Sequence, residues 1–207
     1  MKFAFDTDEV LRDTLNKVSA VYEKFFIEDY VYEEGEEEFN YEIIKPIDSY
    51  DFSNHFKFPS DGEYINFMYM DFPMNICGHA PSVSPNTFNI LSNIQKTVLK
   101  KRDKLSIICS AVAKQKPASL FFYSKYGAEV DEILFYNKKN CKKMWSKFDV
   151  IVTANPQLLE IKPKNKVSIK ISTDYNKNLV ADFEIQTIED FTSIYNRLNL
   201  KHVKSIR

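Results

Sequence analysis

The sequence predicts an α/β fold built on a parallel β-sheet. From residue 85 onward, short apolar runs alternate with helical patterns. Strands that are separated by helices are joined by right-handed crossovers and therefore lie parallel. The chain has 207 residues, of which 44% are hydrophobic and 28% charged. This size and composition fit one α/β domain, or one such domain that carries an insertion.

The first strand is predicted at the N-terminus, where two Phe lie within four residues and two carboxylates follow. Alternation along a strand places Asp6 and Asp8 on one side and Thr7 on the other. Two adjacent carboxylates repel each other unless one keeps its proton or a cation lies between them. Asp8 could instead cap the next helix, which one apolar stripe predicts over residues 9–28.

The middle of the chain is less regular. Gly35 divides two aromatic-containing arms, so residues 30–41 favour a hairpin or an extended excursion. Its five glutamates could bind a cation or a basic partner, although a solvated loop tip is favoured. Ser60 is a suitable N-cap for a short helix over residues 61–70. In the apolar, irregular segment that follows, His79 is more plausible as a hydrogen-bonded structural residue than as a substrate contact.

The later half alternates between strands and helices. Strands are expected at residues 105–109, 130–136, 149–153 and 166–171, and helices at residues 85–101, 117–126, 138–147 and 187–198. Ligands bind such sheets at the carboxyl ends of the strands. That rule brings together Asp6, Ser110 and the turn at residues 153–155.

Composition excludes several classes of function. The net charge of −1 gives no nucleic-acid signal and no polybasic membrane signal, and no apolar run approaches the ~18 residues of a membrane span. Three cysteines without a CxxC pair suggest reduced thiols in the cytoplasm. The chain has 17 Phe and 12 Tyr but only 4 Gly, which indicates an aromatic core or interface.

The stretch Phe3-Ala4-Phe5-Asp6-Thr7-Asp8-Glu9-Val10-Leu11 resembles motif I of the haloacid dehalogenase (HAD) superfamily. This resemblance implies a Rossmann-like, three-layer α/β/α core formed by residues 1–29 and 84–207. It also implies a small cap-like insertion after the first helix, at residues 30–83. In that family the first Asp attacks phosphorus, the second is an acid/base, and Mg²⁺ bridges them to the phosphate. Glu9 stands where the family has Gly.

The resemblance assigns roles to further residues. If the protein is active, Asp6 is the nucleophile, Asp8 the acid/base, Ser110 a phosphate hydrogen-bond donor and Lys139 the charge neutraliser. Lys138 is the alternative to Lys139, and Lys114 and Lys116 are competitors. An active site would hold Mg²⁺ through Asp6, Asp8 and Asn155.

The last motif departs from the family. Nucleotidase-like members have two acids before the turn that ends in Pro, whereas this chain has Thr153 and Ala154 before Asn155-Pro156. Mg²⁺ prefers hard anionic oxygen ligands, and phosphoryl transfer depends on charge neutralisation. We therefore expect no bound cofactor and a catalytically degenerate site.

A second resemblance is to HAD-like proteins of crAss-like tailed bacteriophages. It is carried by residues 71–80, residues 153–156 and Lys162-Pro163. It implies a structural subunit of a virion, in a tail ring or barrel, located in the virion or the host cytoplasm. The expected partners are other protein subunits, in a homo-oligomer or a virion assembly. The alternatives are a Mg²⁺-dependent phosphohydrolase of the 5′-nucleotidase type that forms an aspartyl-phosphate, and a module that binds phosphate or nucleotide without hydrolysis.

Overall fold

A computed structural model describes residues 1–29 and 39–204 of the chain. Its centre is a six-stranded, fully parallel sheet in the order β3-β2-β1-β4-β5-β6. The strands are β1 (Lys2–Asp6), β2 (Lys104–Ser110), β3 (Glu132–Tyr136), β4 (Val150–Thr153), β5 (Val167–Ile171) and β6 (Phe183–Ile185). The α/β fold with a parallel sheet is thereby confirmed.

The first five strands lie where the sequence predicts them, because each is a run of apolar residues bounded by polar ones. β6 was not predicted. It has three residues and only one, Ile185, is buried, so it carries too little of the two-residue alternation that marks a strand. It pairs with β5 through Ile171 and Ile185 and forms one edge of the sheet.

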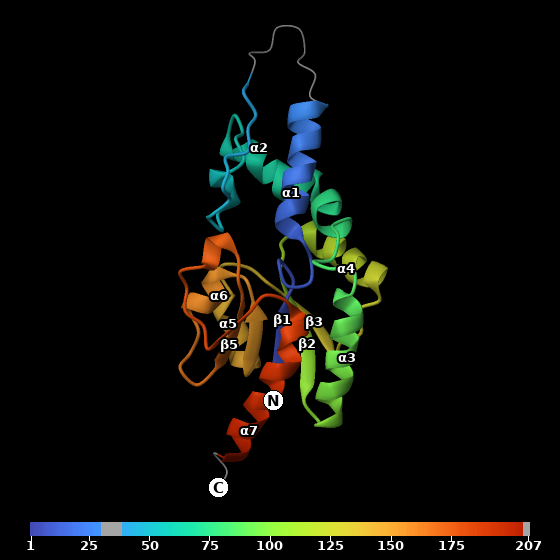
Figure 1. Cartoon of the computed structure of the whole chain (residues 1–207). Coiled ribbons are helices and arrows are strands. Elements are labelled where there is room, and N and C mark those ends of the chain that lie inside the picture. The colour runs from blue at the N-terminus through green and yellow to red at the C-terminus, as the bar shows by residue number, and fades with distance from the viewer. Residues whose placement is uncertain (30–38, 205–207) are drawn as a thin grey trace.

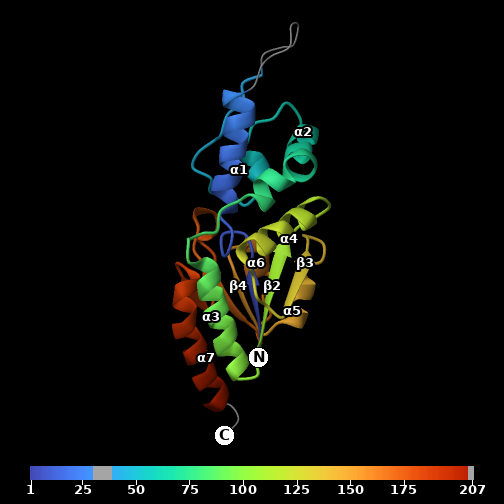
Figure 2. The same cartoon turned by 90° about the vertical axis from the view of Figure 1, so that its right-hand side faces the viewer.

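Helices cover both faces of the sheet (Figures 1 and 2). One face packs against α3 (Thr87–Lys100), α4 (Gln115–Tyr126) and α7 (Phe191–Lys204), and the other against α5 (Lys142–Lys147) and α6 (Pro156–Glu160). The interior positions are fully buried apolar side chains such as Phe3, Phe5 and Ile107 on the first face and Ile108 and Ile151 on the second.

In the later half of the chain, the predicted starts of two helices were wrong. The helix predicted at 138–147 begins only at Lys142, because Asn137 and Asn140 close a turn before it: Asn140 Oδ1 accepts the Asn137 N–H at 2.7 Å. The helix predicted at 187–198 begins at Phe191 and is preceded by a 3₁₀ turn. α6 was missed because it has only five residues, whereas Gly127 ends α4 as predicted, with φ of +62°.

A second group of helices stands over the carboxyl ends of the strands (Figure 1). This helical layer, residues 14–29 and 39–78, contains α1 (Thr14–Tyr22) with its π-helical continuation Glu23–Glu28, and α2 (Asp61–Asn66). It also contains a 3₁₀ turn, Phe52–Asn54, and two π-helical segments, Phe67–Asp71 and Met74–Gly78. The last segment is helical where an irregular stretch was predicted.

Aromatic rings hold the helical layer together. The ring of Tyr22 lies within 6 Å of the rings of Phe26, Phe56, Phe58 and Phe67. The predicted N-cap of α2 is present: Ser60 Oγ accepts the Glu63 N–H at 3.3 Å. The buried residues of α1 pack in the same hydrophobic cluster, so α1 is part of this layer. Whether residues 30–83 act as a cap stays a prediction, and residues 30–38, with most of the predicted hairpin or excursion, lie outside the described residues.

Candidate active site

The loop between β1 and α1, residues 7–13, is a tight turn that we call the motif loop. The N–H groups of Leu11 and Arg12 donate to the Thr7 carbonyl at 2.9 and 3.0 Å. Glu9 has φ of +61°, a left-handed conformation that favours the Gly found there in the resembling motif. The predicted start of the first helix, at residue 9, was therefore wrong: α1 begins at Thr14.

Glu9 also caps α1. Its Oε1 accepts the N–H of Leu15 at 2.8 Å, whereas the side chain of Asp13, the residue before the helix, makes no capping bond. Asp8 is therefore not the cap that sequence reasoning offered as an alternative. Burial raises the pKa of Glu9 to about 8, and the neighbouring charge of Asp8 adds to this rise.

Asp6 is enclosed at the end of β1, with 2% of its surface exposed. Its Oδ2 accepts two hydrogen bonds, from Thr153 Oγ1 at 2.6 Å and from the Tyr136 hydroxyl at 2.9 Å. Its Oδ1 accepts the Thr7 N–H at 2.9 Å. Burial is the largest cause that raises the pKa of Asp6, to about 7, and the charge of Asp8 acts in the same direction.

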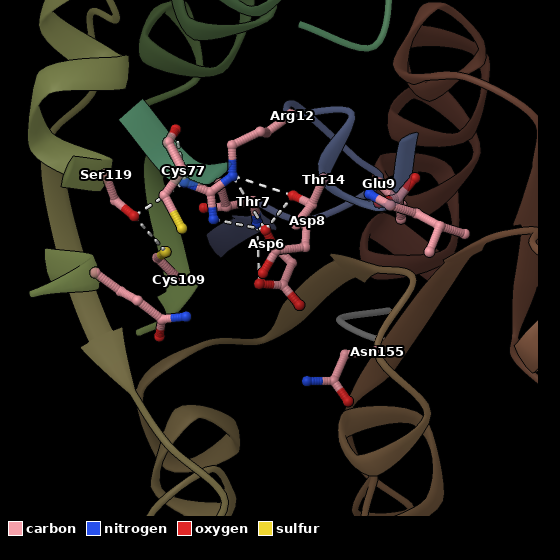
Figure 3. Close-up of polar contacts among 12 residues, drawn as sticks. Asp6, Thr7, Asp8, Glu9, Arg12, Thr14, Cys77, Cys109, Ser119 and Asn155 are labelled. Atoms are coloured by element: carbon pink, nitrogen blue, oxygen red, sulfur yellow. Dashed lines mark hydrogen bonds and ion pairs between the residues drawn. The ribbon is translucent and has the colours of Figure 1, made fainter. Parts of the chain in front are cut away.

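The turn after β4 supports this arrangement and offers no acid. Asn155 donates through Nδ2 to the Tyr136 hydroxyl at 3.0 Å, and its Oδ1 accepts the Gln157 N–H at 2.9 Å, which caps α6. Figure 3 shows Asn155 lying apart from Asp6 and Asp8. Both polar groups of the Asn155 side chain therefore have partners within the protein.

Asp8 faces a buried cation. Because β1 ends at Asp6, the predicted alternation does not extend to Asp8. Its Oδ1 accepts from Arg12 Nη2 at 2.6 Å, from Arg12 Nε at 3.1 Å and from Thr14 Oγ1 at 2.5 Å (Figure 3). Thr7 points the other way from Asp6, as predicted, and its hydroxyl donates to the Ile108 carbonyl at 2.8 Å.

Arg12 joins three parts of the molecule, and its side chain is 1% exposed. Nη1 donates to the Cys77 carbonyl of the helical layer at 3.3 Å and to Ser119 Oγ on α4 at 3.0 Å. The guanidinium also lies over the ring of Phe122, 5.5 Å from its centroid. A single charged group thus connects the motif loop, the helical layer and the core.

A tyrosine of the helical layer contacts the core. The ring of Tyr50 packs on that of Tyr175, which follows β5, with a centroid distance of 5.5 Å. Burial raises the pKa of Tyr50 well above its usual range, and the charges of Asp8 and Asp6 act in the same direction. The ring contact joins the helical layer to the turn that follows β5.

The remaining candidates from the sequence are Ser110 and several lysines. Ser110 ends β2 on the same face of the sheet as Asp6, two residues beyond Ile108, which pairs with Asp6. Lys139 has an exposed side chain, and the described partners of Asp6 do not include it. Of its competitors, Lys114 Nζ donates to the Met70 carbonyl at 3.0 Å and Lys116 lies over the ring of Phe135.

His79 directly follows the last segment of the helical layer. It is exposed, its backbone N–H donates to the Met74 carbonyl at 2.8 Å, and its ring packs edge-on against Phe121. The hydrogen bond comes from the backbone and not from the imidazole, so a hydrogen-bonded structural role for this side chain stays a prediction.

No protein-family model and no curated protein matches the chain. Solved structures do match. A haloacid dehalogenase-like hydrolase from Burkholderia xenovorans LB400 superposes with a TM-score of 0.54 at 14% identity, covering 93% of this chain and 94% of the other. A dehalogenase solved with an intermediate complex gives 0.54 at 9% identity, covering 93% and 96%. The chain has a HAD-like fold.

Within this HAD-like fold, the residues present do not fit a bound Mg²⁺. The part of the chain that the structure describes contains no group of three His, Cys, Asp or Glu side chains that could hold a metal ion. Both oxygens of Asp6 accept hydrogen bonds from the protein, and Thr153 donates a hydrogen bond where an acidic ligand would offer a lone pair. Mg²⁺ needs near-octahedral oxygen ligands, and carboxylates are the protein groups that attract it most strongly.

The sequence named Asp6, Asp8 and Asn155, whose site roles stay predictions, and it did not name Tyr136 or Arg12, which bond Asp6 and Asp8. Tyr136 carries no local signal, since it is simply the last residue of a strand. Arg12 did have a signal: it stands four residues after Asp8, a spacing that allows an ion pair.

In the described residues no helix is long and apolar enough to cross a membrane.

Proposed function

We propose that this protein has a HAD-like fold without HAD phosphohydrolase chemistry, and that it works by binding other proteins. The observation that carries this proposal is the environment of Asp6, whose Oδ2 accepts from Thr153 and Tyr136. In the resembling enzymes an acid on the β4 side helps to hold a cation at this place. Here the side chain of Thr153 stabilises the Asp6 carboxyl directly.

Two charge arguments support an inactive site. A carboxylate that attacks a phosphate meets like charge, and catalysis depends on neutralising that charge. With its pKa raised to about 7, Asp6 is itself protonated in roughly half of the molecules at neutral pH, which weakens it as a nucleophile. Asp8, the presumed acid/base of the resemblance, is engaged by Arg12 and Thr14.

A phosphatase screen tests the proposal. Phosphate release from aryl phosphates and nucleoside monophosphates is measured with Mg²⁺ for the wild type and for Asp6→Asn. We expect no difference between the two proteins. Release that depends on Asp6 overturns the proposal and favours the 5′-nucleotidase alternative with its aspartyl-phosphate intermediate.

A second experiment introduces an acid at position 153, where the resembling enzymes have one. Thr153→Asp places a carboxylate beside Asp6, and we expect this variant to bind Mg²⁺ measurably in titration calorimetry while the wild type does not. Thr153→Asn is the matched control, because it has the same shape without the charge. Mg²⁺ binding by the wild type that Asp6→Asn abolishes contradicts our interpretation of the site.

The identity of the partners rests on the sequence resemblance to phage HAD-like proteins, which suggests other subunits of a virion, in a tail ring or barrel. Exposed apolar side chains on the helical layer, such as Ile65 and Met70, also suit a protein that makes interfaces. Fractionation of purified particles, followed by mass spectrometry, tests this location. A protein found only in the host lysate, free of particles, contradicts the virion assignment.

A further inference from the structure

Charge is distributed unevenly between the two parts of the molecule, although the net charge of the whole chain is only −1. The helical layer, residues 14–29 and 39–78, has nine acidic side chains and four lysines. The acids are Glu23, Glu28, Asp29, Glu42, Asp48, Asp51, Asp61, Glu63 and Asp71. The rest of the described chain is correspondingly basic, so the acidic charge is concentrated in the helical layer and the basic charge in the core.

Part of the basic charge gathers on one face of the core, where α5 packs against the sheet. Lys138, Lys139, Lys142, Lys143 and Lys147 form what we call the lysine face, on α5 and the turn before it. All five are exposed, and residues 137–148 contain no acid. The ion pairs found among residues 1–29 and 39–204 use other lysines, namely Lys57, Lys162, Lys166 and Lys170. The lysine face therefore has no acidic partner within the described structure.

The helical layer presents charged and apolar side chains side by side. Along α2 and its π-helical continuation, Asp61, Glu63 and Asp71 accompany two exposed apolar side chains, Ile65 and Met70, which are 50% and 42% exposed. We call these five residues the acidic face. Apolar residues surrounded by charged ones are the arrangement found in protein–protein interfaces.

One molecule does not bring these two faces together. Figures 1 and 2 both show α2 in the helical layer and α5 beside the sheet, apart from each other. Charges of opposite sign on separate surfaces attract a second copy in a head-to-tail orientation. Such heterologous contacts build rings when the rotation closes and filaments when it does not.

We propose that this protein associates with itself head to tail, with the acidic face of one copy docked on the lysine face of the next. This inference rests on the proposed role as an interaction protein and specifies one partner, a second copy of the chain. The contact is electrostatic at its rim, so salt should weaken it: the screening length falls from about 10 Å at 0.1 M salt to about 3 Å at 1 M.

Sedimentation velocity on the full chain tests the proposal. At low ionic strength the weight-average mass should rise with concentration above the 24.3 kDa of one chain, and high salt should return it to that value. The double variant Lys142→Glu/Lys143→Glu should weaken association at least about tenfold, because it places like charges opposite each other. The matched control Lys96→Glu/Lys104→Glu makes the same change in net charge elsewhere on the core and should associate like the wild type.

A mixing experiment gives the sharpest result. Asp61→Lys/Asp71→Lys reverses the acidic face, and this variant alone should also be monomeric, with circular dichroism confirming that it is folded. Mixed in equal amounts with Lys142→Glu/Lys143→Glu, it should associate again, because each reversed face now meets an opposite charge.

Three results overturn the proposal. These are a wild type that stays monomeric at low salt, a control variant that dissociates as fully as the lysine-face variant, and a mixture that stays monomeric. Lysine-face-dependent binding of heparin without self-association overturns it too, since a polyanion is then the partner. None of these results affects the proposed absence of phosphatase activity, which the Asp6→Asn comparison tests separately.

Discussion

At the scale of single residues, two buried charged groups define the candidate site. Asp6 lies among three donors that favour its ionised form, yet burial raises its pKa to about 7. Arg12 keeps its charge, since the carboxylate of Asp8 faces it. Breaking a buried pair such as Arg12–Asp8 leaves a charge without a partner, which costs about 3–5 kcal/mol.

Asp6 makes stability depend on pH in a predictable direction. Its pKa is raised from 3.8 to about 7, so between these values the folded protein binds more protons than the unfolded chain. The free energy of unfolding therefore falls as pH rises through this window, by up to about 4 kcal/mol at ~1.4 kcal/mol per pKa unit.

Asp6→Asn removes this contribution, and we expect its free energy of unfolding to fall less than that of the wild type between about pH 4 and pH 8. Urea unfolding across that range measures the difference. Asp71→Asn, which changes an exposed acid, should follow the wild type. Identical slopes for Asp6→Asn and the wild type would show that Asp6 ionises normally.

At the scale of elements, the start of α1 depends on Glu9. This residue accepts the Leu15 N–H and adopts φ of +61°, so its side chain stabilises the helix while its backbone is strained. The two contributions can be separated by substitution, because Ala removes the cap and keeps the strain, whereas Gly removes both.

We expect Glu9→Ala to lower the free energy of unfolding by about 1 kcal/mol or more through the lost cap. Glu9→Gly should be more stable than Glu9→Ala by roughly 1 kcal/mol, since Gly adopts positive φ without a steric penalty. Glu23→Ala, an exposed change further along the same helical stretch, is the control. Chemical denaturation measures all three, and equal stability of the Ala and Gly variants would argue against strain at this position.

The sequence was sufficient for elements whose signal is local. The first five strands are apolar runs, and α2 and α4 have a clear N-cap or C-cap at Ser60 and Gly127. It was insufficient where distant residues decide the outcome. The start of α1 depends on the side chain of Glu9, which accepts the Leu15 N–H. The partners of Asp6, Tyr136 and Thr153, are 130 and 147 residues away in the sequence.

At the scale of the whole molecule, the helical layer and the core are joined at the motif loop. The Asp13 N–H donates to the Pro81 carbonyl at 3.0 Å and the Val83 N–H to the Leu11 carbonyl at 3.2 Å, so the chain that returns from the helical layer is tied to the loop that leaves the core. Arg12 adds its contacts to Cys77 and Ser119. These connections favour unfolding of both parts as one cooperative unit.

The single tryptophan allows a test of this cooperativity. Trp145 is buried in the core on α5, so its fluorescence reports on the core, whereas far-UV circular dichroism includes the helical layer. We expect the two signals to give one denaturation midpoint in the wild type. In Arg12→Met the circular dichroism midpoint should fall below that of fluorescence, and Arg102→Met, on the surface, should leave both in place. Coincident midpoints in Arg12→Met would show that other contacts join the two parts.

The buried guanidinium of Arg12 also limits how this sequence can change over generations. Asp8, Thr14 and Ser119 all receive hydrogen bonds from the same side chain. If any one of them is lost, part of the guanidinium loses its acceptor. Water cannot take the place of that acceptor, because the cation is buried. We therefore expect these four positions to be inherited as a set, so that descendants either keep all of them or replace them together.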